Sequence, residues 1–395
     1  ERTHHDRPPS HHQSHPNAAL GRQKRRRMST PAKRRTSISS SANALALTST
    51  LTSSTNPVET SSSLPYFLPE LIPLVAGRLT SLQDFFALRA ACRTYRDLLP
   101  PSPSNLASQA PLLLVRHKAS ASEALFHAPL RRILRFRFPS TCIDRLTRFY
   151  SFGCCIATHD REDPRELRIR HLLTGEHASL PYPPEDFDGI IFSGDLVLTF
   201  QRFHDVLYFC RIGDGQWRAA VCDEGYLICS LLLVKGTLYG LIFPNYCLAV
   251  LEIHNDSVAL SFLGDESNEE SVGSIEYSMF WLAECRDELL LVLAVHYSPP
   301  VYHVFKWQSV ERKWARTTTL GGCSLFLNTY QFAGCLGPDH PEVRRDCMYF
   351  TGGLGKWTEY SVVDGSWHDH VADYQGRVVT KSYRPPLVWV LPSIC

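Results

Sequence analysis

The sequence lacks the segments that place a protein in a membrane or in an oxidising compartment. No apolar run approaches the 18 residues that a membrane-spanning helix needs, and no stretch has the composition of a signal peptide. The 13 cysteines include no Cys-x-x-Cys pair, so neither a zinc site nor a disulfide framework is indicated. Most of them lie in apolar, strand-like runs, where a free thiol behaves as a small hydrophobic side chain. We therefore expect a protein of the nucleus and/or cytoplasm, with no metal site and no membrane partner.

The sequence also lacks the motifs of the common enzyme families. It contains no Gly-x-Ser-x-Gly elbow, no His-Glu-x-x-His motif and no P-loop. Gly321-Gly322-Cys323 places a thiol after two glycines, but no base that would activate it is identifiable, and a turn explains the pattern. The acidic runs at 185–188 and 265–270 are explained by solvated turns. We expect a non-catalytic protein that needs no cofactor.

Charge is distributed unevenly along the 395 residues, although the net charge is only +2. Residues 1–63 contain ten Lys and Arg and three Asp and Glu, which leaves 31 of the 41 basic and 36 of the 39 acidic residues in 64–395. A folded part with a net charge of about −5 argues against a nucleic-acid partner.

Residues 1–63 are rich in Ser, Thr, His and Pro and have little apolar periodicity, which predicts a disordered tail. Two basic clusters in it are typical of a bipartite nuclear-localisation signal, and a solvated basic tail is the alternative. The clusters are Lys24, Arg25, Arg26 and Arg27, then Lys33, Arg34 and Arg35. If translation begins at Met28, the first cluster is absent.

Residues 68–99 have the pattern of two or three short helices. Ser81 followed by Asp84 is typical of a capped helix start. Apolar residues then recur at steps of three and four, which predicts one apolar helix face. They are Phe85, Leu88, Cys92, Tyr95 and Leu99. So short a module cannot bury its apolar faces by itself, so we expect it to pack on the rest of this protein or on another protein.

The same residues resemble an F-box, the helical motif that docks on a Skp-type adaptor. The matching segments are Leu68-Pro69-Glu70-Leu71, Arg78-Leu79, Asp84-Phe85, Leu88-Arg89 and Cys92-Arg93-Thr94-Tyr95-Arg96. Two features depart from the family pattern: the Leu-Pro pair is one residue too close to Glu70, and Tyr95 replaces a Trp. The resemblance implies binding to the adaptor, and through it to a cullin. The implied contacts are Leu68, Pro69, Leu71, Ile72, Val75, Leu79, Phe85, Leu88, Cys92 and Tyr95.

After this module the apolar period changes from 3.6 to 2. Prolines at 100, 101 and 103 end the helical pattern. Apolar and charged residues then alternate in 134–139 and 167–170, as they do in half-buried strands. We expect a tail over 1–63, the F-box over 64–103, a linker over 104–130 and an all-β domain over 131–395.

The predicted strands repeat along the β domain. A Gly or Asp at 195, 236, 287 and 346 precedes an apolar strand, with spacings of 41, 51 and 59 residues, and a second strand follows each. Trp217, Trp314 and Trp367 close three of these four units. A period near 50 residues predicts a kelch-like β-propeller of five or six blades, and a β-sandwich is the alternative.

The motifs of this region are similar to those of plant F-box proteins that carry a kelch-like region, the domain of unknown function 295. They include His171-Leu172-Leu173-Thr174-Gly175, Leu320-Gly321-Gly322-Cys323-Ser324 and Asp346-Cys347-Met348-Tyr349-Phe350. The resemblance implies the substrate-receptor subunit of a Skp–cullin–F-box ubiquitin ligase, a non-catalytic subunit whose propeller holds a target protein.

Two alternatives are a propeller protein that does not reach the adaptor and an enzyme with a site in the propeller channel. Loops 264–274 and 336–345 are candidate target contacts. The predicted fold class is α+β and multidomain, with a short helical F-box before a large all-β propeller.

Overall fold

The chain divides after Ser63 into two units, residues 1–63 and 64–395. The computed structural model describes parts of the second unit alone. These parts are residues 68–116, 123–134, 148–159, 166–223, 225–264, 279–297, 300–352, 355–372 and 387–394. The predicted disordered tail, with its basic clusters, therefore lies outside the described residues.

Three short helices open the described part of the chain: α1 (Leu71–Ala76), α2 (Leu82–Ala90) and α3 (Arg93–Leu98). The single apolar face predicted over 85–99 is wrong, because the helix breaks at Cys92. That residue is extended, and its Sγ accepts a hydrogen bond from the Tyr95 amide at 3.4 Å, which caps α3. α2 does begin after Ser81, but the Ser81 side chain makes no capping hydrogen bond. None of the described helices is long and apolar enough to cross a membrane.

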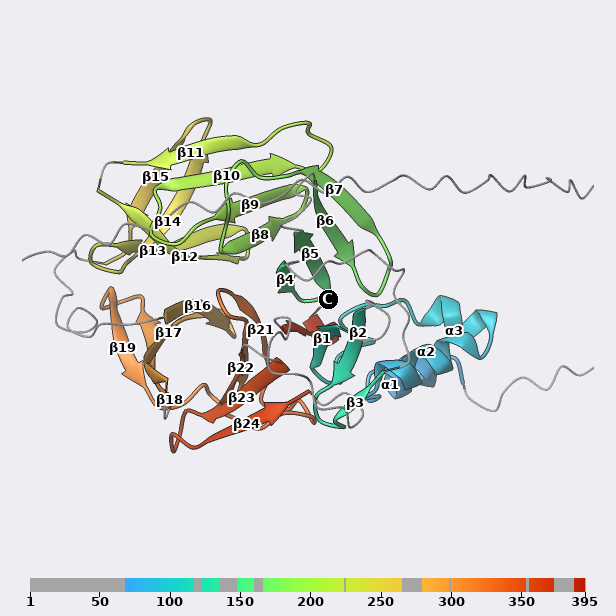
Figure 1. The fold of residues 1–395 in the computed structure, drawn as a ribbon. Coiled ribbons are helices and arrows are strands. Elements are labelled where there is room, and N and C mark those ends of the chain that lie inside the picture. Colours follow the sequence, from blue (N-terminus) through green and yellow to red (C-terminus); the bar gives the residue numbers. More distant parts are fainter. Residues whose placement is uncertain are drawn as a thin grey trace, which may run out of the picture. The chain divides into compact units, whose positions relative to one another are not determined.

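The described strands form five hydrogen-bonded sheets (Figure 1). The first contains, in spatial order, β25 (Val388–Val390), β1 (Leu112–Arg116), β2 (Glu123–His127) and β3 (Arg132–Ile133). The second contains β4 (Arg148–Phe152), β5 (Cys155–His159), β6 (Glu166–His171) and β7 (His177–Pro181). The third has eight strands, which are β8 (Gly189–Ser193), β9 (Leu196–Phe200), β10 (Val206–Arg211), β11 (Arg218–Cys222), β12 (Leu227–Val234), β13 (Thr237–Phe243), β14 (Cys247–His254) and β15 (Ser257–Phe262).

The remaining two sheets complete the β domain. One contains β16 (Met279–Cys285), β17 (Glu288–Tyr297), β18 (Pro300–Gln308) and β19 (Lys313–Thr317). The other contains β20 (Ser324–Leu327), β21 (Phe332–Leu336), β22 (Cys347–Thr351), β23 (Lys356–Ser361) and β24 (Trp367–Val371), with β21 at its edge. A 3₁₀ turn over Pro392–Ile394 follows β25.

The eight-stranded sheet consists of two antiparallel units, β8–β11 and β12–β15. A short parallel pairing of β11 with β15 joins them. The described strands therefore form six units. The edge strand of each unit contacts that of the next, in the series β25, β4, β8, β12, β16 and β21. This succession of sheets makes a mostly β, propeller-like domain.

The predicted repeat corresponds to these units. The turns at 195, 236, 287 and 346 directly precede β9, β13, β17 and β22. Asp287 and Asp346 have φ of 68° and 55°, the left-handed conformation that ends a tight turn. Each repeated Trp begins, adjoins or lies in the fourth antiparallel strand of its unit: Trp217 beside β11, Trp314 in β19 and Trp367 in β24. The final spacing is the longest because two strands, β20 and β21, precede β22 in its unit, where the other repeat units have one.

The predicted linker over 104–130 is wrong, since it contains β1 and β2. Residues 112–115 form an uninterrupted apolar run that is buried on both faces, so the alternation used to predict strands is absent there. The strand predicted over 167–170 is confirmed in β6, where Leu167 and Ile169 are buried and Arg168 is exposed. Of the strand predicted over 134–139, only residue 134 lies among the described residues, after the end of β3.

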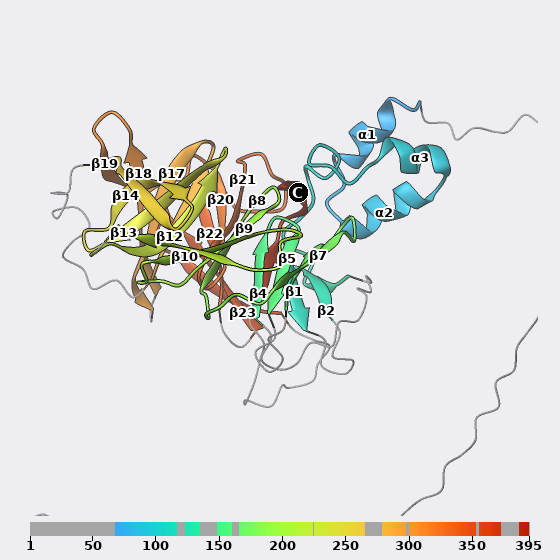
Figure 2. The same ribbon diagram turned by 90° about the horizontal axis from the view of Figure 1, so that it is seen from above.

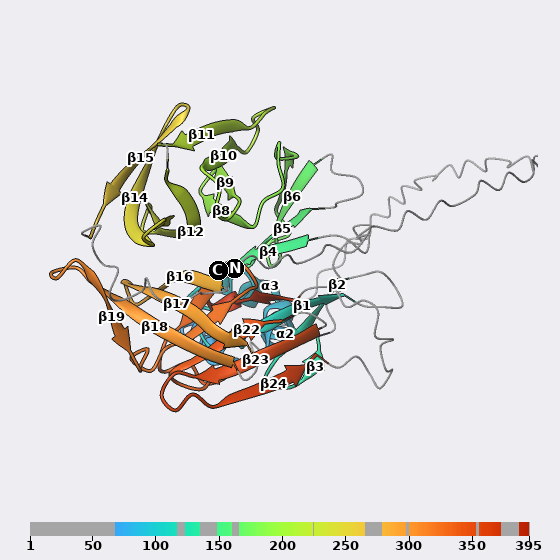
Figure 3. The same ribbon diagram turned by 60° about the vertical axis from the view of Figure 1, so that its left-hand side comes forward.

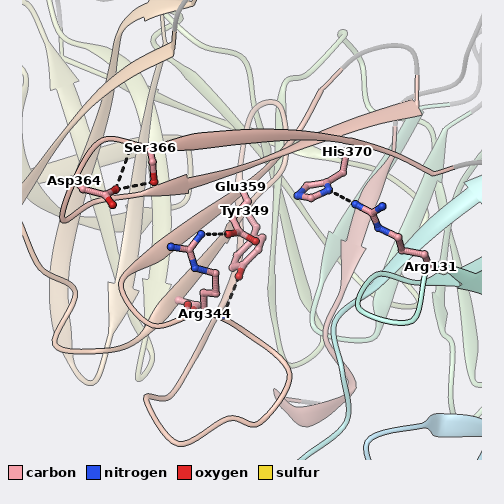
Figure 4. A network of polar contacts seen from close by, with 8 residues as sticks. Arg131, Arg344, Tyr349, Glu359, Asp364, Ser366 and His370 are labelled. Atoms are coloured by element: carbon pink, nitrogen blue, oxygen red, sulfur yellow. Dashed lines mark hydrogen bonds and ion pairs between the residues drawn. The ribbon is translucent and has the colours of Figure 1, made fainter.

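The last strand of the chain completes the first sheet. β25 pairs with β1 through Leu112–Val390, Leu113–Trp389 and Leu114–Val388. A second link lies at the outer strands, where the Arg131 guanidinium donates to Nδ1 of His370 on β24 at 2.7 Å (Figure 4). His370 also stacks on Trp357, with ring centroids 4.0 Å apart. The ladder of β1 with β25 thus joins the two ends of the β domain within the first unit, and the Arg131–His370 contact joins this unit to the last one.

Candidate functional site

An apolar face on helix α1 lies open to solvent. Leu71 and Leu74 are 43% and 64% exposed, and Leu68 and Val75 are exposed beside them. Spacings of three and four residues place Leu71, Leu74 and Val75 on one face of the helix, and Leu68 lies just before the helix begins. The opposite face, with Ile72 and Ala76, is buried. An exposed cluster of aliphatic side chains at this spacing is the kind of surface that a groove on a partner protein covers.

The structure separates the ten predicted adaptor contacts into three groups. Leu68, Pro69, Leu71 and Val75 are exposed; Leu79, Leu88 and Cys92 are half-buried; Ile72, Phe85 and Tyr95 are buried. The three buried residues pack inside this chain, and adaptor contact stays a prediction for all ten. Leu74 was missed, because it is absent from the family pattern, although its helical spacing to Leu71 could have indicated it.

The three buried residues are covered because the helices share a core with the β domain. Ile72, Phe85 and Tyr95 belong to one group of buried apolar side chains that also includes Leu112 of β1 and Val388 of β25. Complete burial of a Phe side chain contributes about 2 kcal/mol. The short module thus obtains from the propeller-like domain the apolar partner that its own length cannot supply. α3 contacts both α1 and α2, so the helices also support one another (Figure 2).

The turn between α1 and α2 is tied to the β domain by buried polar contacts. The Gln109 side chain donates from Nε2 to the Leu79 carbonyl at 2.5 Å. The Thr80 carbonyl accepts from the Ala110 amide at 3.1 Å and contacts Nε2 of His127 at 3.3 Å. Gln109 and His127 are both almost fully buried. We call the contacts of residues 79–80 with 109–110 and with His127 the module clamp.

His127 fits the module clamp only as a neutral ring. Its Nε2 faces the Thr80 carbonyl, which requires a proton there, while its Nδ1 accepts from the Leu130 amide at 3.1 Å. A second proton, on Nδ1, would point at the Leu130 N–H group and remove the acceptor of that hydrogen bond. Burial is the main cause that lowers the pKa of His127, and the hydrogen bond to Thr80 acts weakly against it.

His340 has the same pattern of contacts as His127, but it contacts Gln109, which is itself part of the module clamp. Its Nε2 faces the Gln109 carbonyl at 3.1 Å, and its Nδ1 accepts from the Glu342 amide at 3.3 Å. Burial lowers the pKa of His340 as well. His340 lies in loop 336–345, so this loop contacts the segment that holds the helices. Most of the other candidate loop, 264–274, lies outside the described residues.

Two features of the cysteines were not predicted from the sequence, a disulfide and a cluster of three thiols. Cys154 is disulfide-bonded, a pairing that no sequence spacing indicated. Cys285, Cys323 and Cys335 lie together, and their sulfur atoms are all within 4.8 Å of one another. Hydrogen bonding with Cys335 lowers the pKa of Cys323, while contact with both neighbours raises the pKa of Cys335. The spacing of these cysteines along the sequence did not indicate this cluster.

A family model assigns most of the β domain. The KIB1-4 beta-propeller model matches residues 125–377. The chain belongs to the KIB1-4 β-propeller family. This is the region of the domain of unknown function 295 type, so that part of the predicted resemblance is confirmed. The model covers none of the three helices, and the F-box stays a prediction.

Other comparisons with this KIB1-4 family member gave only distant likeness. No curated protein matches the chain. Three similar solved structures have these values. U3-55K has 10% identity, covering 70% of this chain and 75% of that chain, with a TM-score of 0.33. The nidogen/laminin complex has 11% identity, covering 72% of this chain and 100% of that chain, with a TM-score of 0.39. Kluyveromyces lactis Hsv2 has 11% identity, covering 52% of this chain and 68% of that chain, with a TM-score of 0.29.

Proposed function

We propose that this protein is a substrate-receptor subunit of a Skp–cullin–F-box ubiquitin ligase. The observation that carries the proposal is the exposed apolar face of α1, which lies within the segment that resembles an F-box. Leu68, Leu71 and Val75 belong to both the exposed face and the family pattern. The KIB1-4 β-propeller is typical of plant F-box-associated proteins and is generally non-catalytic, which supports the same role.

The apolar face has the character of a binding hot spot. Few residues of an interface contribute most of its affinity, and these are large side chains that become desolvated on binding. Leu71 and Leu74 are the two exposed leucines within helix α1, and each would contribute about 1–2 kcal/mol when an adaptor groove covers it.

The proposed mechanism is proximity. The helices bind the adaptor, the propeller binds a target protein, and other subunits carry out the ubiquitin chemistry. Joining both sites in one chain raises the effective concentration of the target near the conjugating enzyme. The module clamp and the shared core around Phe85 favour this role, because they hold the docking helices against the domain that would carry the target.

The test uses calorimetry to compare how tightly two double variants bind a recombinant Skp-type adaptor, each lacking one pair of exposed aliphatic side chains. Leu71→Ala with Leu74→Ala is expected to weaken adaptor binding by about 100-fold, since two contacts of about 1.4 kcal/mol are lost. Val310→Ala with Val363→Ala removes exposed side chains from the β domain and is expected to leave the affinity unchanged; Val310 is 88% exposed. Wild-type affinity in the Leu71 and Leu74 double variant would refute adaptor docking on α1.

A second candidate function is a propeller binding protein that does not engage the adaptor. The burial of Ile72, Phe85 and Tyr95 favours it, because three of the family's expected contacts are used inside this chain. The same calorimetry decides between the two candidates: a wild-type chain that shows no heat of binding with the adaptor supports the second.

A further inference from the structure

Three cysteines from distant parts of the sequence meet where two sheets of the β domain adjoin. Cys285 ends β16, Cys323 directly precedes β20, and Cys335 lies in β21. β16 contacts both β20 and β21, so the cluster lies between the sheet of β16–β19 and the sheet of β20–β24. Figure 3 shows the strands of these two sheets, β16–β19 and β22–β24, beside each other. We call these residues the thiol triad.

The triad is compact and shielded. The Cys335 thiol donates to Sγ of Cys285 at 3.0 Å, and all three sulfurs lie within 4.8 Å of one another. Cys285 and Cys323 are buried, and Cys335 is half-buried. Metal–sulfur bonds of about 2.3 Å place the sulfurs of a three-coordinate site about 4 Å apart. Small rotations of the side chains are therefore enough to bring the sulfurs to the ligating distance.

The loop that carries Cys323 is fixed by the half-buried carboxylate of Asp346. Oδ1 of Asp346 accepts hydrogen bonds from the Leu320 amide at 2.5 Å, the Gly322 amide at 3.1 Å and the Thr319 hydroxyl at 2.7 Å. The Asp346 amide in turn donates to the Cys323 carbonyl at 3.0 Å. Burial acts to raise the pKa of Asp346, but these hydrogen bonds lower it overall, so the carboxylate stays charged.

Gly322 is required for this arrangement. Its φ is 82°, and a Cβ added there would lie 2.9 Å from Cβ of Pro338. The loop is thus held in one conformation by the Asp346 carboxylate on one side and by close packing on the other. Metal ligands are commonly held in place by surrounding hydrogen bonds, and this constrained loop holds Cys323 in the same way.

We propose that the thiol triad is a binding site for a soft, thiophilic metal ion, and that Cu(I) is the ion it takes. Thiolates select Cu(I) and Zn(II) over harder ions. Structural zinc sites are almost always four-coordinate, whereas the cluster contains three ligating groups among the described residues. The three sulfurs suit a three-coordinate ion. Binding displaces thiol protons to solvent, and the ion then links β16 to β20 and β21.

The test measures Cu(I) binding by the reduced, full-length chain in the absence of oxygen. Cu(I) is titrated in competition with the chromogenic chelator bicinchoninate, and bound copper is counted by elemental analysis after gel filtration. We expect one Cu(I) per chain. Cys285→Ala and Cys335→Ala are each expected to lower the affinity by about 100-fold, the loss expected of a removed ligand.

Cys229→Ala is the matched control. Cys229 is as buried as Cys285 but is not part of the triad, so its loss is expected to leave copper binding unchanged. Cys285→Ser, which keeps the side-chain size, replaces Cys285→Ala if that variant does not fold. Failure of the wild-type chain to bind copper would overturn the proposal, as would equal affinity in the Cys285 variants. Zn(II) that displaces an equal concentration of Cu(I) would overturn the choice of ion.

Discussion

Replacement of Trp389 is expected to open the propeller-like domain at its closing strand. The Trp389 side chain is fully buried, and its Nε1 donates to the Tyr349 carbonyl at 3.1 Å. A buried Trp removes up to about 250 Å² from water, equivalent to at most about 6 kcal/mol. Truncation of a buried Trp to Ala typically costs about 3–5 kcal/mol, and the orphaned carbonyl adds about 1 kcal/mol. We therefore expect Trp389→Ala to lower the free energy of unfolding by about 5 kcal/mol.

The backbone contacts of Trp389 remain in this variant, which isolates the contribution of the side chain. Its amide donates to Oδ1 of Asn328 at 2.9 Å, and its carbonyl accepts from the Ser151 hydroxyl at 2.6 Å. The control is Trp367→Ala on β24, where the side chain is 40% exposed and the expected loss is about 2 kcal/mol. Scanning calorimetry should show a fall in melting temperature of about 10–20 °C for Trp389→Ala and about 5 °C for Trp367→Ala.

The same variant reports on the helices. β25 directs Trp389 toward the last sheet, and it directs Val388 and Val390 into the core shared with Phe85. Alternation along one strand thus couples the closing contact to the docking module. Amide hydrogen exchange in α1–α3 should be faster in Trp389→Ala than in Trp367→Ala. Equal melting temperatures for the two variants would refute the closing role of β25.

Two further predictions concern charge at the module clamp and at the triad. Because the pKa values of His127 and His340 are lowered in the folded chain, the unfolded chain binds protons first as pH falls. The stability that these neutral histidines contribute is therefore fully present above about pH 6.5 and is lost as the pH falls below it. Denaturant midpoints measured from pH 7.5 to 5 should decline, and they should decline less steeply in His127→Gln. Asp346→Asn is expected to weaken Cu(I) binding by about 10–100-fold while adaptor affinity stays constant, and unchanged copper affinity would contradict its positioning role.

Local chemistry explains which elements could be predicted from the sequence. The turns at Asp287 and Asp346 were found because a Gly or Asp before an apolar run is a short-range signal. β25 was not found, because it has three residues and pairs with β1, more than 270 positions earlier in the chain. β1 was not found either, since the run Leu112–Val115 has no alternation and is equally compatible with a buried helix.

The candidate sites depend on information that is absent from local patterns. The helical spacing of Leu71 and Leu74 could indicate that they share a face, but the sequence does not say that this face is open to solvent while Phe85 shares a core with β1 and β25. Cys285, Cys323 and Cys335 have no ligand spacing along the chain, and only the adjacency of β16 with β20 and β21 brings them together. The pattern of burial and the thiol triad are properties of the tertiary structure.

The packing of the helices on the β domain would affect what the proposed receptor selects. On a flexible linker, a target would sample many positions, and any lysine within reach could be modified at a rate set by effective concentration. Here the Gln109 contact with Leu79, the His127 contact with Thr80 and the shared core restrict that sampling. The position of a bound target relative to an adaptor on α1 would then be nearly fixed. Under the proposed function, modification would depend on where a target's lysines lie as well as on how tightly the propeller binds it.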